Sequence, residues 1–289
     1  GLTKNPSKVN AYVIPISSFE EDLKYLKENG YTTVLMEDVI NYVDGNEALP
    51  EKPIVLTFDD GFENNLEYGL PLLEKYDMKV TEVEYIVQWA EDARSYEQKY
   101  KEQMCFHMCE LFNVGHINCG LMEDYSVEHT AQKLKELCQR AGKLVIGVEP
   151  MPYSGIPDVK KGWAVVKAAD CENAKLILDT WHWVRANQPI ELSVLEGIPA
   201  DKIVSIQIND VWERPYATTI LRDESMHDRL APGTGIGCTA AFVKMVKEKG
   251  IKPNAIGVEV ISDAILAKGL EYAANHTYCL LYTSDAADE

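Results

Sequence analysis

Between residues 78 and 278, short apolar segments alternate with longer amphipathic segments, and this pattern constrains the fold more than any other feature of the sequence. It predicts parallel strands joined by crossover helices, because a parallel connection needs about a dozen residues or more and is usually helical. Two earlier segments bring the candidate strands to eight, so we expect an α/β fold of the (β/α)8 TIM-barrel type. The candidate strands are residues 32–39, 53–60, 79–87, 115–122, 143–150, 175–183, 202–210 and 255–262, and the candidate helices include 90–112, 126–142, 165–174 and 239–250.

The charge of the chain narrows the classes of partner. Its 289 residues include 28 Lys and Arg against 46 Asp and Glu, a formal net charge of −18. Nucleic acids and anionic membranes are therefore not expected as partners, because a phosphate-binding protein needs a basic surface. The sequence also lacks an uninterrupted apolar stretch of about 18 residues, so we expect no transmembrane helix.

The cysteines indicate a reducing compartment. All seven lie beyond residue 100, and their odd number and unpaired spacing do not suggest a disulfide framework. We expect reduced, mostly buried thiols in a cytosolic enzyme.

Four oxygen-bearing side chains stand at or near the ends of predicted strands: Glu149, Asp179, Gln207 and Glu259. The carboxyl ends of barrel strands meet at one mouth, so we expect these side chains to converge. Three carboxylates at one point repel one another unless a cation neutralises them. Such oxygen donors suit Mg²⁺, Mn²⁺ or a similar divalent ion rather than a thiolate-bound zinc. The alternative is that the carboxylates only cap the helices that follow.

Further motifs accompany these four residues. A DTxH-type element occupies residues 179–182, and residues 229–235 read RLAPGTG. Over about residues 78–278, these motifs and the strand-end residues in GVEP and GVEV resemble, in order and spacing, the sugar phosphate isomerase/epimerase family of xylose-isomerase-like barrels. Some members of that family, including dehydroshikimate dehydratases, use Gln at the third ligand position, so Gln207 is compatible with the resemblance.

The resemblance implies a metal-dependent sugar (phosphate) isomerase or epimerase, or a related lyase, that abstracts a proton next to a carbonyl through an enediolate. The implied cofactor is a divalent metal (Mn, Mg or Co), held by Glu149, Asp179, Gln207 and Glu259. Glu149, Glu259 and His182 are the implied acid/base groups. The expected partner is a small sugar or sugar acid, the expected location of this part is cytoplasmic, and family members often form homo-oligomers.

Two residues are candidates for substrate binding. Arg229 can pair with a substrate carboxylate or phosphate, and Trp181 can stack on a sugar face. Each has a simpler alternative. Arg229 follows a run of charged residues at 222–228, so it can equally form a surface ion pair. Trp181 can be a core residue, and His182 a hydrogen-bonded structural histidine.

Residues 1–81 carry a different signal. A short apolar strand at 54–58 ends in Asp59, Asp60 and Gly61, in the sequence PIVLTFDDGF. Over about residues 10–81 the chain resembles the polysaccharide deacetylases (NodB-like carbohydrate esterases), which are usually secreted or at the cell surface. The resemblance implies that Asp59 is a general base and Asp60 a metal ligand beside two histidines of an HSxxH-type motif. None of the six histidines has HxxxH spacing, so deacetylase activity is not expected.

The ends of the sequence suggest a composite. Residues 279–289, CLLYTSDAADE, resemble the conceptual translation of a transposase adapter used in DNA sequencing libraries, and the alternative is an ordinary acidic tail. The chain opens at Gly1, as an internal fragment does. We therefore expect a chimera of a deacetylase-like fragment (1–81), a barrel (82–278) and an artefactual tail, with a natural fusion as the alternative. Either the barrel carries an active metal site or the composite is inactive.

Overall fold

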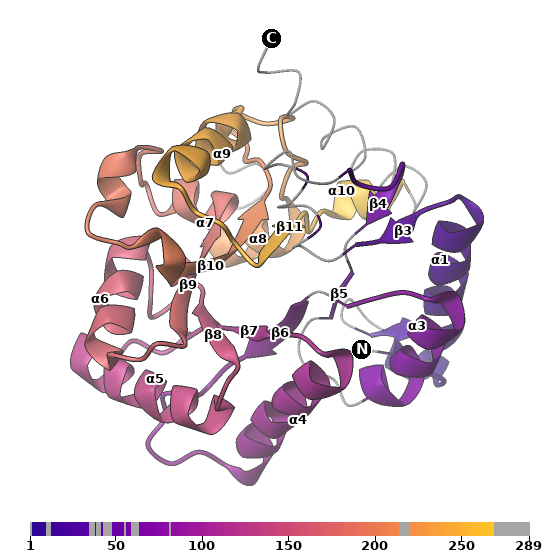
Figure 1. Cartoon of the computed structure of the whole chain (residues 1–289), viewed down its shortest axis with the longest axis horizontal. Helices are drawn as coiled ribbons and strands as arrows, with labels where there is room; N and C mark the ends of the chain where they lie inside the picture. Colours follow the sequence, from indigo (N-terminus) through magenta and orange to yellow (C-terminus); the bar gives the residue numbers. More distant parts are fainter. Residues whose placement is uncertain are drawn as a thin grey trace.

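A curved parallel sheet forms the centre of the computed structural model, which describes residues 2–9, 13–34, 38, 42, 48–54, 56–58, 64–80, 82–213 and 220–268. Within these residues seven strands pair in sequence order, so each strand lies beside its neighbour in the chain. Helices surround the strands on the outside (Figure 1). The strands are β5 (Thr57–Phe58), β6 (Glu82–Ile86), β7 (His116–Cys119), β8 (Val145–Val148), β9 (Ala174–Asp179), β10 (Ile203–Ile208) and β11 (Ala255–Val258).

The first part of the chain contributes one strand, β5, to this sheet and forms further parallel pairs beside it. β3 (Thr32–Thr33) pairs in parallel with β4 (Pro53–Ile54), and only two residues separate β4 from β5. One short stretch of chain therefore pairs with β3 on one side and with β6 on the other. The predicted strand 53–60 is thus divided in two, with β4 in a two-stranded sheet and β5 in the seven-stranded sheet. A further parallel pair joins β1 (Leu2–Thr3) to β2 (Ile14–Pro15).

The main helices follow their strands as a TIM barrel requires. The predicted helix at 90–112 is shorter than expected, because Ser95 and Gln98 form a capping box that starts it at Tyr96. Ser126 and Asp158 likewise accept hydrogen bonds from the first turns of the next two helices. The helices are α1 (Ile16–Glu28), α3 (Leu70–Tyr76), α4 (Tyr96–Phe112), α5 (Val127–Ala141), α6 (Val159–Ala169), α7 (Thr180–Arg185), α8 (Leu221–His227), α9 (Cys238–Lys249) and α10 (Asp263–Leu266), with short turns at Pro6–Lys8, Asn65–Gly69, Leu192–Leu195 and Ala200–Lys202.

One hydrophobic core joins the two parts of the chain. Leu23 of α1 and Leu73 of α3 are buried in the same cluster as Val83 of β6 and Ile117 of β7. Burial of such side chains is the main favourable contribution to folding. The segment resembling a deacetylase therefore shares its core with the strands that follow. Asp59, Asp60 and residues 279–289 lie outside the described residues.

Buried thiols and a buried ion-pair cluster lie among the helices. Five of the six cysteines in the described part are buried, as the sequence predicts for most of them. Burial raises the pKa of the Cys109 thiol to about 12. Glu102 of α4 is also buried and binds Arg94 and Arg140, with N–O distances of 2.6 to 2.9 Å. No helix in the described ranges combines the length and the apolar composition that a membrane crossing requires.

Candidate active site

Three carboxylates converge at the carboxyl ends of the strands. Glu149 directly follows β8, Asp179 ends β9 and Glu259 directly follows β11. One carboxylate oxygen of each lies within 4.8 Å of the others. Glu149 and Asp179 are buried, and Glu259 is half-buried. The structure thus brings together three of the four predicted ligands, which come from strands that are separated along the chain.

Gln207 lies on β10, between two of these strands. It is in register with Asp179 of β9 and with Gly257 of β11. Its Nε2 donates a hydrogen bond to Oε1 of Glu84 at 3.1 Å. Its Oε1 is buried and has no hydrogen-bond partner among the described residues. A buried amide oxygen of this kind remains available as a ligand for a cation.

Asp179 is held from three directions. Its Oδ1 accepts a hydrogen bond from the backbone N–H of His182 at 2.7 Å and so caps α7. Its Oδ2 accepts from Asn209 Nδ2 at 2.8 Å and from Arg229 Nη1 at 3.0 Å. Asp179 therefore does cap a helix, as the alternative interpretation expects. The cap uses only Oδ1, so it is compatible with a place for Asp179 in the carboxylate cluster.

Arg229 is buried inside the site and does not form a surface ion pair. Its side chain is 2% exposed, and its Nη1 also lies 3.5 Å from Oε1 of Glu259. Nε donates to the carbonyl of Ser225 at 2.9 Å, and Nη2 donates to the Ser225 hydroxyl at 2.8 Å. Burial lowers the pKa of the guanidinium, but the charges of Glu259 and Asp179 raise it by more, so that the pKa lies above its ordinary value. Arg229 is therefore a fixed positive charge between two carboxylates.

His182 lies between an acceptor and a donor. Its Nε2 is 3.4 Å from Oε1 of Glu149 and 3.3 Å from Nη2 of Arg229. An arginine N–H can only donate, whereas a carboxylate can only accept. The neutral ring can therefore accept at Nε2 from Arg229, and a ring protonated at Nε2 can donate to Glu149.

Trp181 is fully buried and packs beneath the arginine. The Arg229 guanidinium lies 5.6 Å from the ring centroid, and the Arg185 guanidinium lies 5.9 Å from it. Tyr153 packs at a tilt against the same ring. Trp181 is 0% exposed, as the core alternative expects, so its observed contacts support Arg229. Direct stacking of Trp181 on a sugar stays a prediction.

The loop at 229–235 is anchored by Asp210. The Asp210 carboxylate accepts hydrogen bonds from the backbone N–H groups of Gly233, at 3.0 Å, and Gly237, at 3.3 Å. Its backbone pairs with Leu230 in both directions. A Cβ at Gly235 would lie 2.2 Å from the carbonyl oxygen of Val211, so only glycine fits there. This anchoring fixes the start of the loop and therefore the position of Arg229.

Other polar residues of the site were not found from the sequence. Ser225 accepts a hydrogen bond from Tyr153 at 3.2 Å as well as those from Arg229. Glu84 of β6 accepts hydrogen bonds from Gln207 and from Asn118 of β7. The signal in the sequence for Glu84 and Asn118 was their position inside predicted strands. Nothing local in the sequence singles out Tyr153 or Ser225, because their role depends on where α8 packs.

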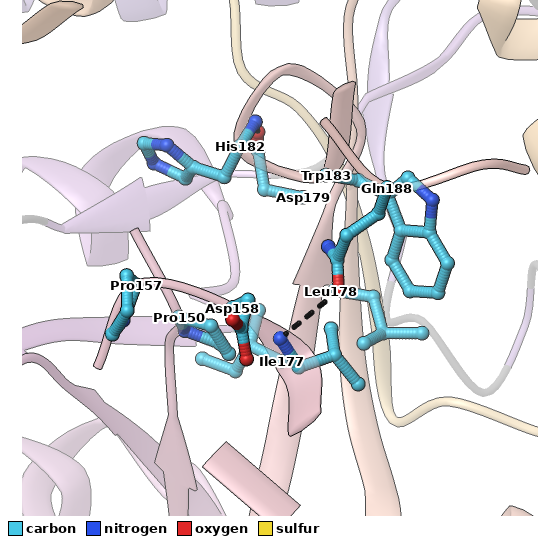
Figure 2. A pocket seen from close by; sticks show the side chains of 10 residues that line it. Pro150, Pro157, Asp158, Ile177, Leu178, Asp179, His182, Trp183 and Gln188 are labelled. Atoms are coloured by element: carbon cyan, nitrogen blue, oxygen red, sulfur yellow. Dashed lines mark hydrogen bonds between the residues drawn. The ribbon is translucent and has the colours of Figure 1, made fainter. Parts of the chain in front are cut away.

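A small cavity lies beside the cluster, between the ends of β8 and β9 and the start of α6 (Figure 2). Asp179 and His182 form part of its lining, together with Pro150, and Gln188 accepts a hydrogen bond from Val159 N at 3.2 Å. Its volume of about 10 Å³ admits at most one water molecule. It is therefore too small to be a sugar site.

The buried Tyr153 predicts a pH effect on stability. Burial raises the pKa of its phenol to about 12. In the unfolded chain the pKa is about 10, so the unfolded state loses this proton first as the pH rises. The free energy of unfolding should therefore fall between about pH 10 and pH 12. Tyr153→Phe should reduce the slope of this fall by the equivalent of up to one proton, as measured by urea titrations at several pH values. Tyr96→Phe, at an exposed site, is the control; equal slopes for the parent and Tyr153→Phe would contradict the prediction.

Two curated relatives share parts of the sequence. The chain is 37% identical over 60 residues to poly-β-1,6-N-acetyl-D-glucosamine N-deacetylase of Escherichia coli (strain K12), covering 21% of this chain and 9% of that protein. It is 28% identical over 140 residues to 3-dehydroshikimate dehydratase of Pseudomonas aeruginosa, covering 47% of this chain and 21% of that protein. The chain thus spans only 9% to 27% of the length of the curated relatives that it matches.

Solved structures resemble the fold over most of the chain. The IolI protein with a bound zinc atom has a TM-score of 0.64 at 17% identity, covering 92% of each chain. A xylose isomerase-like TIM barrel protein of Mycobacterium smegmatis in complex with magnesium has a TM-score of 0.62 at 12% identity, covering 98% of this chain and 93% of that one. D-Allulose 3-epimerase of Methylomonas sp. in complex with D-allulose has a TM-score of 0.55 at 14% identity, covering 78% of each chain.

The family model described as xylose isomerase-like TIM barrel matches residues 23–277. The match confirms the predicted fold class, and it begins well before residue 78, where the resemblance in the sequence begins. The division at residues 81 and 82, and the composite origin, stay predictions. The chain belongs to the xylose isomerase-like TIM barrel family.

Proposed function

We propose that the protein is a metal-dependent isomerase or epimerase of a small sugar or sugar acid, or a related lyase, which moves a proton next to a carbonyl. The observation that carries the proposal is the convergence of Glu149, Asp179 and Glu259 within 4.8 Å. Structural neighbours that hold zinc or magnesium, and one that holds D-allulose, support it.

The donor set fits a divalent cation such as Mn²⁺, Mg²⁺ or Co²⁺. Arg229 offsets only part of the negative charge of the three carboxylates, and a doubly charged ion would offset more of it. Gln207 supplies a neutral oxygen that accepts no hydrogen bond from the described residues. Carboxylate and amide oxygens are the ligands that hard cations prefer. When bound, the ion would polarise a carbonyl oxygen and stabilise the negative charge that develops there.

The residues of the chain supply the proton transfer. Glu149 and Glu259 approach the cluster from opposite ends of the row β8 to β11, so that one can remove a proton and the other can return it. His182 can exchange a proton with Glu149 through Nε2. Arg229 holds Asp179 and Glu259 in place and can also face a carboxylate or phosphate on the substrate.

Two other functions carry less support. Deacetylase chemistry would need Asp59, Asp60 and a pair of spaced histidines that the sequence lacks. An inactive composite would hold no ion at the carboxylates. The metal content of the protein separates this second alternative from the proposal.

Metal analysis of the purified chain tests the proposal. After loading with Mn²⁺ and dialysis, we expect about one ion per chain by plasma mass spectrometry. Glu259→Gln should lose most of it, because it removes a charged ligand of the cluster. Glu248→Gln, at an exposed position of α9, is the matched control. A parent protein without bound ion would reject the proposal. If the parent binds the ion, the substrate class can be identified by incubating the loaded enzyme with a panel of ketoses and keto acids in deuterated water. NMR then shows which compound takes up deuterium.

A further inference from the structure

A hydrogen bond across the barrel joins Glu84 to Gln207. Glu84 lies on β6 and Gln207 on β10, and three strands separate them in the sheet. Glu84 Oε1 accepts from Gln207 Nε2 at 3.1 Å and also from Nδ2 of Asn118 on the neighbouring β7. The carboxylate of Glu84 is therefore held by one strand and binds the side chain of another.

This bond decides which end of the Gln207 amide is free. A side-chain amide has an oxygen that accepts and a nitrogen that donates, and the two ends have nearly the same shape. Oε1 of Glu84 accepts from both neighbouring amides, so Glu84 selects the orientation of Gln207 with Nε2 toward itself. Oε1 is thereby left buried without a hydrogen-bond partner in the described ranges. With the reverse orientation, two N–H groups would replace the oxygen and would repel a cation.

We propose that Glu84 is a positioning residue, which orients the Gln207 amide so that its oxygen serves as the fourth ligand of the metal site. This inference rests on the proposed function. A histidine ligand is commonly fixed by a carboxylate that binds its other nitrogen, and such outer partners affect metal affinity. Here the Gln207 amide takes the place of the histidine ring. The amide depends more strongly on an orienting partner, because in its reverse orientation it would direct N–H donors toward the metal ion.

A double-mutant cycle on Mn²⁺ affinity tests the assignment. In the parent, Glu84→Gln should weaken binding by about 10- to 100-fold, because a glutamine partner no longer enforces one amide orientation. In a Gln207→Ala background, the same substitution should change the dissociation constant by less than about twofold, because no amide remains to be oriented. Titration calorimetry gives both values, and circular dichroism in EDTA shows that each variant is folded.

The cycle distinguishes orientation from charge alone. If Glu84 acted only as a nearby negative charge, Glu84→Gln would weaken binding equally in both backgrounds, and the inference would be wrong. Unchanged affinity of Glu84→Gln in the parent would also overturn it. Asp124→Asn, an exposed acid beyond the end of β7, controls for the loss of one negative charge on this side of the barrel. Failure of the parent to bind Mn²⁺ would reject the proposed function itself.

Discussion

Arg229→Met should lower the free energy of unfolding by about 3–5 kcal/mol in EDTA, because it leaves buried carboxylates without their counter-charge. The side chain of Asp179 is fully buried, and Arg229 gives it an N–O contact of 3.0 Å. Arg229 also binds Ser225 and contacts Glu259 and His182. Methionine fills a similar volume but offers none of these donors. Urea denaturation followed by circular dichroism measures the loss.

The same variant should depend strongly on a divalent cation. Without Arg229 the cluster has no fixed positive charge, so Mn²⁺ binds to a more negative site and stabilises the folded state by more than it does in the parent. Arg222→Met, at an exposed position of α8, is the control and should stay within about 0.5 kcal/mol of the parent. Two results would contradict the proposed role of Arg229. One is a loss below about 1 kcal/mol for Arg229→Met, and the other is equal stabilisation of Arg229→Met and of the parent by Mn²⁺.

Glu102→Gln should cost about 3 kcal/mol or more, and Mn²⁺ should not restore it. Glu102 is 4% exposed and neutralises Arg94, which is 8% exposed, while Arg140 retains partial access to water. Removing the single carboxylate leaves a buried guanidinium without its partner. This cluster contains a single carboxylate between two guanidinium groups and so offers no cation site, in contrast to the carboxylates at the barrel mouth. The comparison therefore separates the general cost of a lost ion pair from the effect of a cation site.

Its control is the exposed pair on the same helix. Glu97→Gln removes the partner of Lys101, where both side chains are largely exposed, and should cost less than about 1 kcal/mol. Chemical denaturation of Glu102→Gln and Glu97→Gln, each in EDTA and in Mn²⁺, gives the four free energies of unfolding to compare with the parent. Equal losses for Glu102→Gln and Glu97→Gln, or a Mn²⁺-dependent recovery of Glu102→Gln, would show that the Glu102 cluster is wrongly described.

The sequence could predict the parts of the site that depend on strand order. Glu149, Asp179 and Glu259 follow apolar runs, and the carboxyl ends of parallel strands meet at one rim, so their convergence needs no knowledge of side-chain packing. Boundaries were less accurate, because capping at Ser95 starts α4 six residues later than the apolar pattern suggests.

The rest of the site depends on tertiary packing. A charged run precedes Arg229, so its burial is invisible until α8 and the loop anchored by Asp210 are in place. Trp181 is an aromatic residue of the kind that can stack on a sugar, but its ring is fully buried beside Arg185, Arg229 and Tyr153. Glu84 acts on Gln207 from 123 residues away, and no local pattern reports such a distance.

The pairing of residues 53–58 with strands on both sides has a consequence for how such barrels diverge. Besides the shared core, the two resemblances meet at the β5–β6 pair, whose backbone amides and carbonyls are the same in every sequence. A strand of one protein can therefore pair with a strand from an unrelated protein when the strand spacing and the apolar faces agree. Glu84 lies on β6, the strand that pairs with β5. If the strands before β6 were exchanged, Glu84 would be the first residue of the proposed site to be affected.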